Sequence, residues 1–218
     1  MRETGWPEVS EGTYAHTPGP LGTWHELKIH LEAVANDAKT FAEPFGAGEP
    51  AYELGLLHDL GKANPAFQEY IRAQAEGRQH PTAPHAIWGA ALIYRLIYKG
   101  AGDAEGWKEL ALPVQGHHAS LPDSGEAAQA YEQFLAEDPE ALQIIRTYLQ
   151  RSRIALTDSL KLPRHRSTRR ELFIRMLFSA LVDADFLDTE RHFDPERWAR
   201  RGGWPNLESL WWRLKTSH

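Results

Sequence analysis

The stretch Leu56-Leu57-His58-Asp59-Leu60-Gly61-Lys62 decides the fold, because it leads an apolar helix directly into two adjacent metal-binding side chains. Neighbouring residues of an α-helix point about 100° apart, so both side chains can face one cation only near a helix end or bend. Gly61 predicts that end, as a C-terminal cap in the left-handed conformation. Lys62 adds a mobile cation suited to an anionic substrate. The stretch therefore predicts a metal site at a helix end.

Around this stretch nearly every segment has helical periodicity. Residues 1–22 are rich in Gly, Pro, Ser and Thr and predict an irregular lead-in. The residues Thr23-Trp24-His25-Glu26 are typical of a capping box, with Thr23 as N-cap of a first helix that carries Leu27, Leu31 and Val34 on one face. We expect a second helix over about 51–60, a third that begins at Asn64-Pro65, and others over 84–97, 103–115, 126–136, 139–152 and 167–190, with loops near 43–50, 77–83, 119–125 and 159–166.

The helix expected over 167–190 is apolar nearly all round in its middle, which is typical of a central buried helix. Alternating strand patterns are nearly absent, and no internal repeat stands out. The sequence therefore predicts one all-α domain over residues 23–218, built around a buried metal site. The tryptophans Trp198, Trp204, Trp211 and Trp212 are interpreted as core and C-terminal packing.

Composition narrows the kind of site. Of the 218 residues 42% are hydrophobic and 25% are charged, an ordinary globular balance. Cysteine is absent, so disulfides and thiolate sites are excluded and any metal must bind histidines and carboxylates.

The chain has neither an apolar run of 18 residues nor a signal-peptide pattern, so we expect a soluble, unexported, cytoplasmic protein. Without a Gly-x-x-x-x-Gly-Lys-Ser/Thr loop it has no helicase motor, and it is either a separate subunit or an excised domain.

Two further segments carry metal-binding side chains where packing alone does not require them. Gly116-His117-His118 precedes a turn and suits a helix end that faces a cavity. In Leu181-Val182-Asp183-Ala184-Asp185 a carboxylate lies within an apolar segment, which is costly unless it is paired or binds a metal. Asp185 continues the core-facing stripe of that helix, eight residues after Leu177.

Two lone histidines are candidates to complete the site. His30 replaces an apolar residue on the buried face of the first helix, and His85 follows Pro84 in a first helical turn. The other histidines lack such context and are interpreted as structural or surface residues: His16, His25, His80, His165, His192 and His218. Asp188, Glu190 and Arg191 are interpreted as a solvated helix end.

The net charge of −6 alone predicts no nucleic-acid partner, but the charges are unevenly distributed. Between residues 146 and 175 nine basic residues face only two acidic ones, Asp158 and Glu171. Such a block in an acidic protein favours binding of a phosphate backbone, and a basic loop that docks an acidic partner is the alternative. The basic residues are Arg146, Arg151, Arg153, Lys161, Arg164, Arg166, Arg169, Arg170 and Arg175, of which Arg164, Arg166, Arg169 and Arg170 are the predicted nucleic-acid contacts.

The ordered set His30, His58-Asp59, His85, His117-His118 and Asp185 resembles the HD superfamily of metal-dependent phosphohydrolases. The surrounding phrases narrow the resemblance to the HD nuclease domain of the type I CRISPR helicase-nuclease. These phrases are Tyr14-Ala15-His16, Trp24 to Leu31, His58 to Lys62, Gly116 to Ala119, and Ser179 to Glu190 with its Val-Asp-Ala-Asp-x-Leu-Asp-Thr-Glu pattern. The resemblance spans about residues 14–192.

The resemblance implies two divalent metals bridged by Asp59. One is held by His30, His58, Asp59 and Asp185, and the other by Asp59, His85, His117 and His118. Asp185 rather than Asp183 is taken as the ligand, because the Ala184-Asp185 pair is the element of this phrase that the family shares. Lys62 is implied to contact the scissile phosphate, so Asp59 and Lys62 are the predicted catalytic residues.

The implied activity is metal-dependent cleavage of single-stranded DNA in CRISPR antiviral defence, by an endo- or exonucleolytic mode left open. The implied partners are a superfamily 2 helicase, as subunit or domain, and a CRISPR surveillance complex. The sulfur-free ligand set favours Mn²⁺, Fe²⁺, Co²⁺ or Ni²⁺ over Mg²⁺. Two alternatives stay open: a phosphohydrolase that acts on nucleotides or cyclic nucleotides, and a degenerate domain that only docks a partner.

Overall fold

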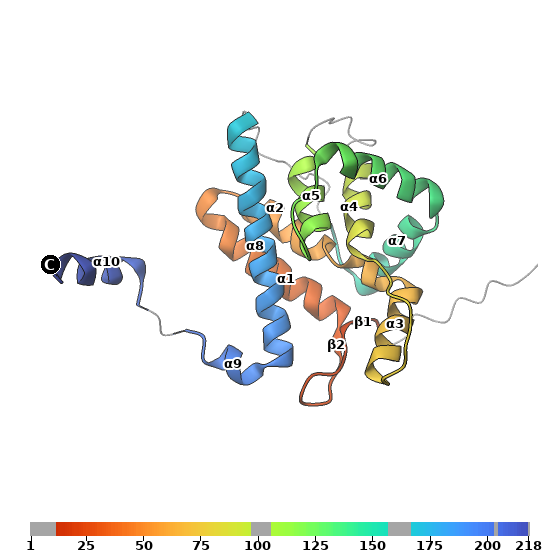
Figure 1. Cartoon of the computed structure of the whole chain (residues 1–218), viewed down its shortest axis with the longest axis horizontal. Coiled ribbons are helices and arrows are strands. Elements are labelled where there is room, and N and C mark those ends of the chain that lie inside the picture. Colours follow the sequence, from red (N-terminus) through yellow and green to blue (C-terminus); the bar gives the residue numbers. More distant parts are fainter. Residues whose placement is uncertain (1–11, 97–105, 157–166, 203–204, 218) are drawn as a thin grey trace, which may run out of the picture.

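The computed structural model describes residues 12–96, 106–156, 167–202 and 205–217, and these form the helical domain of Figure 1. Its two strands, β1 (Tyr14–His16) and β2 (His25–Glu26), pair antiparallel. The helices are α1 (Leu27–Ala42), η1 (Glu43–Phe45), α2 (Gly48–Leu57), η2 (Leu60–Ala63), α3 (Pro65–Ala75), α4 (Ala86–Tyr94), α5 (Lys108–Gly116), α6 (Ser124–Glu137), α7 (Ala141–Ser152), α8 (Ser167–Phe193), α9 (Pro195–Ala199) and α10 (Leu207–Thr216). The predicted all-α class is confirmed.

The core lies where α8 crosses α1, α2 and α5. Leu31, Leu57 and Leu181 are fully or almost fully buried there. Helices α1 and α2 approach closely because Gly55 has no side chain, and a Cβ atom at that position would lie 2.3 Å from Ala35 Cα. This packing places the C-terminal end of α2, where His58 and Asp59 lie, against α8.

The first helix begins later than the sequence indicated. Glu26 is the N-cap of α1 and makes no side-chain capping bond, so the predicted capping box at Thr23 is wrong. Residues His25 and Glu26 belong to β2, and the Leu27 amide donates to Thr13 O at 2.8 Å. Residues 25–26, which local periodicity assigned to a helix, therefore pair with β1 as a strand. Strand β1 itself lies within residues 1–22, which were expected to be irregular.

The second helix ends at Leu57, three residues before the expected end. Asp59 has φ −112° and ψ 14°, and the short helix η2 follows it. Gly61 is not among the positive-φ glycines of the described residues, so its predicted left-handed cap is wrong. Its role is close approach, because a Cβ atom there would lie 2.2 Å from His85 O. The bend that turns Asp59 toward His58 is made by the α2–η2 junction instead.

Most other boundaries agree with expectation to within a few residues. The predicted cap at Asn64 is confirmed, since its side chain accepts a hydrogen bond from the Ala66 amide at 3.0 Å. Helix α4 begins at Ala86 with His85 as N-cap. The predicted start of the next helix at 103 and the loop at 159–166 lie outside the described residues. Within those residues, no helix is long and apolar enough to span a membrane.

Helix α8 is the longest helix among the described residues but is not buried all round. Leu172 is 61% exposed and Met176 is 42% exposed, so only one face of the helix packs into the core. The expected packing of the C-terminal tryptophans is wrong, because Trp211 and Trp212 are 55% and 61% exposed and α10 projects from the body. Trp198 is also 38% exposed, and Trp204 lies outside the described residues.

Candidate metal centre

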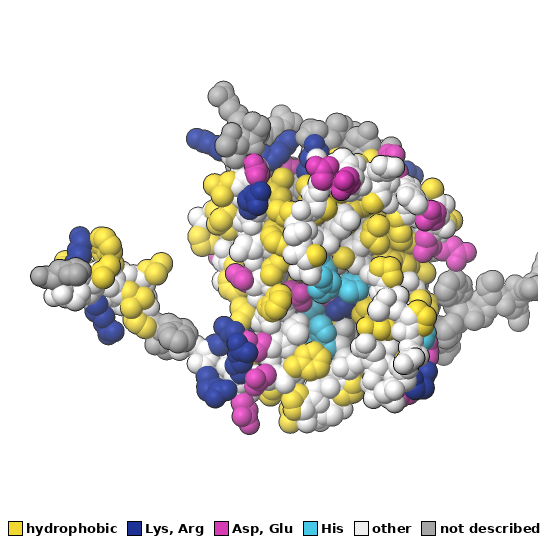
Figure 2. Space-filling view, viewed as in Figure 1, with side chains coloured by type: hydrophobic (Ala, Val, Ile, Leu, Met, Phe, Trp, Pro, Cys, Tyr) yellow, Lys and Arg dark blue, Asp and Glu magenta, His cyan; other side chains and the backbone are white. Residues whose placement is uncertain are grey.

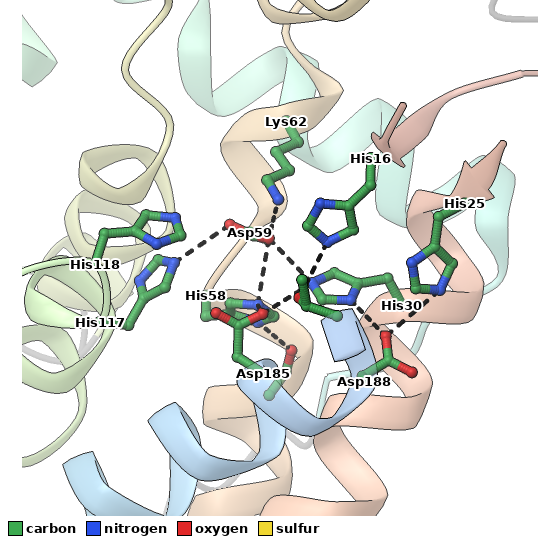
Figure 3. Close-up of polar contacts among 12 residues, drawn as sticks. His16, His25, His30, His58, Asp59, Lys62, His117, His118, Asp185 and Asp188 are labelled. Atoms are coloured by element: carbon green, nitrogen blue, oxygen red, sulfur yellow. Dashed lines mark hydrogen bonds and ion pairs between the residues drawn. The ribbon is translucent and has the colours of Figure 1, made fainter. Parts of the chain in front are cut away.

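Asp59 lies at the centre of a cluster of histidines, fully buried at the α2–η2 junction. Its Oδ2 atom lies 3.1 Å from His30 Nε2 and 3.3 Å from His58 Nε2. Its Oδ1 atom lies 3.2 Å from His85 Nε2 and 3.4 Å from His117 Nε2. One carboxylate thus offers a separate oxygen to each of two pairs of imidazoles. Figure 3 shows the rings of His30, His58 and His117 and the Lys62 side chain around it.

Asp185 of α8 joins the Oδ2 side of the cluster. Its Oδ1 atom lies 3.5 Å from His30 Nε2 and 3.7 Å from His58 Nε2, and the residue is buried. Asp183 on the same helix is exposed to solvent. Of the two carboxylates that the sequence left as candidates, only Asp185 faces the other ligands.

His118 joins the Oδ1 side, at the open edge of the cluster. Its Nε2 atom lies 2.7 Å from His85 Nε2, which brings two ring nitrogens face to face. Two groups of potential ligand atoms result, and they share Asp59. The first group is His30, His58, Asp59 and Asp185, and the second is Asp59, His85, His117 and His118.

The histidine rings are held from behind so that each Nε2 atom points inward. His58 Nδ1 donates to Gly55 O at 2.8 Å, and His117 Nδ1 donates to Val114 O at 2.6 Å. When the ring is neutral, such partners keep its proton on Nδ1 and leave Nε2 able to bind a metal. Both carbonyls come from the preceding helical turn, so the helix end itself orients its terminal histidine.

The cluster fits divalent cations. His58 Nε2, His117 Nε2 and Asp59 Oδ1 are buried and make no hydrogen bond of acceptable geometry. A buried polar atom without such a bond costs roughly 1–3 kcal/mol, which a bound cation would offset. The donor atoms are imidazole nitrogens and carboxylate oxygens, which suit first-row transition metals. Both groups are therefore suitable to hold a metal.

The charged groups of the cluster shift one another's pKa values. Although burial opposes both shifts, Lys62 and His58 hold the pKa of Asp59 well below its usual range, and Asp59 and Asp185 raise the pKa of His58 to about 10. Lys62 Nζ lies 2.6 Å from Asp59 Oδ2, and Lys62 is buried. Burial and the neighbouring His117 lower the pKa of His118 to about 4, so this ring is neutral near pH 7.

The structure adds residues that sequence interpretation missed. Asp188 is 3% exposed and accepts from His30 Nδ1 at 2.7 Å, so its interpretation as part of a solvated helix end is wrong. His25 Nε2 lies 3.4 Å from Asp188 Oδ2, and the His16 ring contacts the His30 ring at 4.9 Å between centroids. Asp188 follows Asp185 by three residues, a spacing that places both on one helix face.

The basic residues of the block that the structure describes do not gather on one surface around the cluster. Arg170 is only partly exposed and its Nε atom lies 2.6 Å from Glu109 Oε1, an ion pair within the fold that does not favour DNA contact. Arg169 is exposed at the N-terminal end of α8, while Arg151 lies on α7, which Figure 1 shows on the other side of the domain. In Figure 2 the basic side chains lie mostly at the edges of the face shown. Lys161, Arg164 and Arg166 lie outside the described residues.

Comparison with known proteins places these features in a family. Residues 15–187 match the family model described as Cas3, HD domain. A CRISPR-associated nuclease/helicase Cas3 of Haloferax volcanii is 35% identical over 123 residues, which cover 55% of this chain and 13% of that protein. The chain therefore matches only a small part of its relative. Because the family match covers most of the chain and includes all the clustered ligands, the chain belongs to the Cas3 HD domain family.

Proposed function

We propose that this protein is a metal-dependent nuclease that cleaves single-stranded DNA by two-metal phosphodiester hydrolysis. The observation that carries the proposal is the sharing of Asp59 between two ligand groups, with one oxygen facing each. Two divalent cations held there would lower the pKa of a shared water and stabilise the leaving oxygen of a phosphodiester. Asp59 is the residue that would help to hold both cations, because it belongs to both ligand groups.

The remaining residues have distinct parts in this chemistry. His58 and His117 are oriented by backbone carbonyls and hold their ring nitrogens inward. Lys62 reaches the same oxygen of Asp59 as His30 does, so its ammonium group can neutralise a phosphate placed against the cluster. His85 and His118 line the side from which that phosphate enters.

The open edge of the site supports a polymeric substrate. His118 is exposed, and Figure 2 shows histidine side chains that reach the surface near the middle of the face viewed. A phosphodiester inside a chain needs such an edge, since the strand must continue on both sides of the scissile bond. We propose that the chain acts with a helicase in CRISPR antiviral defence, because its Haloferax volcanii relative is named a nuclease/helicase.

The proposal is tested by nuclease assays on single- and double-stranded DNA with Mg²⁺, Mn²⁺, Fe²⁺, Co²⁺ and Ni²⁺. We expect cleavage of single strands with the transition metals and its loss in His58→Ala and Asp59→Ala. Asp183→Asn, which alters an exposed carboxylate on the same helix as Asp185, serves as the matched control. Cleavage by both alanine variants at the parental rate would show that the assignment is wrong.

The same experiment separates the alternative activity on nucleotides. A panel of nucleotides and cyclic nucleotides is incubated with each of the same metals. Turnover of one nucleotide without cleavage of DNA would favour the phosphohydrolase alternative. Parental protein that binds no metal and cleaves neither substrate would favour a docking role.

A further inference from the structure

Three histidines of the cluster, His30, His58 and His117, form a hydrogen bond through Nδ1, but the acceptor is not of the same kind in all three. His58 and His117 donate to carbonyls three residues earlier in their own chain segments. His30 lies in the first turn of α1, and its Nδ1 donates instead to Asp188 Oδ2 on α8, 158 residues away, at 2.7 Å. Figure 3 shows this contact on the side of His30 that faces away from Asp59.

Asp188 is itself held from two further directions. His25 Nε2, on strand β2, lies 3.4 Å from its Oδ2 atom, and Arg191 Nη1 donates to its Oδ1 atom at 3.3 Å. Arg191 also donates to Asp37 Oδ2 of α1 at 3.3 Å. A carboxylate that is 3% exposed is costly unless it is paired in this way. The position of Asp188 is therefore determined by three elements: α1, α8 and β2.

We propose that Asp188 is a positioning residue that fixes the His30 tautomer and ring orientation so that its Nε2 atom faces the metal, with His25 and Arg191 holding the carboxylate in place. The inference rests on the proposed function only in assuming that His30 is a ligand. A carboxylate behind a metal-binding histidine orients the ring and makes it a stronger ligand than a carbonyl does.

The proposal makes a selective prediction, because only one of the two groups contains His30. Replacing Asp188 should lower the affinity for the metal that His30, His58, Asp59 and Asp185 would hold. The metal held by Asp59, His85, His117 and His118 should be unaffected, since His117 has its own carbonyl partner. If Asp188 had only a structural role, replacing it would lower the metal affinity of both groups together.

The test is Asp188→Asn, which keeps the size of the side chain and an oxygen acceptor but removes the charge. We expect titration of the metal-free protein with Co²⁺ to show one site weakened by roughly 10- to 100-fold and the other unchanged. Asp183→Asn is the matched control on the exposed face of α8. In a His30→Ala background, Asp188→Asn should change Co²⁺ affinity no further. Parental affinity at both sites, or an equal loss at both with a lower unfolding temperature, would overturn the proposal.

A second readout needs no metal. In metal-free protein, nitrogen-detected NMR of the histidine rings should show a proton on His30 Nδ1, shifted downfield by the carboxylate, and that signal should move upfield in Asp188→Asn. Unchanged His30 signals would overturn the proposal. If the parental protein binds no Co²⁺, the proposed function fails, and the NMR measurement still decides whether Asp188 positions His30.

Discussion

At the scale of single residues, each oxygen of Asp59 meets two imidazole nitrogens, and this arrangement depends on side chains from four separate segments. The seven residues of the two groups were candidate ligands from sequence, because His or Asp at a core-facing point of an apolar helix is unexpected from packing alone, and the family resemblance joined them into one set. Asp188 was not identified, because the acidic and basic residues that follow it make the segment resemble a solvated helix end. Its burial depends on His25 and His30, whose proximity only tertiary structure shows.

Lys62 can be separated from the metal ligands by substitution. Lys62→Met removes the ammonium group 2.6 Å from Asp59 Oδ2 but no ligand atom. We expect kcat for DNA cleavage to fall by roughly 100-fold, as when one preorganised electrostatic contact to a transition state is lost. Bound metal, measured by mass spectrometry, should stay at the parental level. Lys28→Met, at a partly exposed lysine of α1, is the control, and a parallel loss of metal and activity would contradict a substrate role.

Metal binding should depend on pH through His58. In the metal-free protein burial lowers the pKa of His58, but Asp59 and Asp185 outweigh burial and raise it to about 10. A metal must displace that proton from the ring, so affinity rises as pH rises. We expect an increase of about tenfold per pH unit between roughly pH 7 and 9, measured by competition with a chelator of known affinity. Affinity that is flat over this range would contradict the charged state of His58.

At the scale of elements, the helices were predictable and their ends were less so. Asn64 caps α3 as expected, because that signal is local and needs no tertiary partner. The box at Thr23 fails because residues 25–26 pair with β1, and Gly61 fails as a cap because His85 packs against it. Both errors lie beside the metal centre, where long-range contacts outweigh local preference.

The close approach at Gly61 can be tested directly. A Cβ atom in Gly61→Ala would lie 2.2 Å from His85 O and 2.7 Å from His85 Cα, so the backbone that carries His85 must move. We expect a loss of roughly 1–3 kcal/mol in the free energy of unfolding and weaker binding at the group that contains His85. Denaturant unfolding and Co²⁺ stoichiometry measure these effects.

Gly48→Ala is the matched control for this substitution. Its Cβ atom would meet first the flexible side chain of Glu43, with Cγ at 3.1 Å, and it lies away from the cluster. Stability and metal content should therefore stay near the parental values. If Gly61→Ala binds both metals as the parent does, the α2–η2 junction tolerates a side chain and does not set the position of His85.

At the scale of the whole molecule, the metal centre joins parts of the chain that are far apart in sequence. Its ligands come from α1, the α2–η2 junction, the start of α4, the end of α5 and the middle of α8. A metal that binds only this folded arrangement stabilises it by mass action, by about 2.7 kcal/mol at a concentration 100 times its Kd. For a chain of this size that raises the unfolding temperature by roughly 5–10 °C.

Chelation should therefore lower the unfolding temperature by that amount, and re-addition of Mn²⁺ or Co²⁺ should restore it. Helix α10 offers an internal comparison, since none of its residues is buried and it projects from the body. A variant without residues 207–217 should unfold at the parental temperature and show the same shift on chelation. Calorimetry of both proteins, with and without metal, measures this. A shift that vanished with α10 would mean that the metal acts through the projecting helix, whereas an equal shift in both proteins locates its effect where α1, α2, α4, α5 and α8 meet at Asp59.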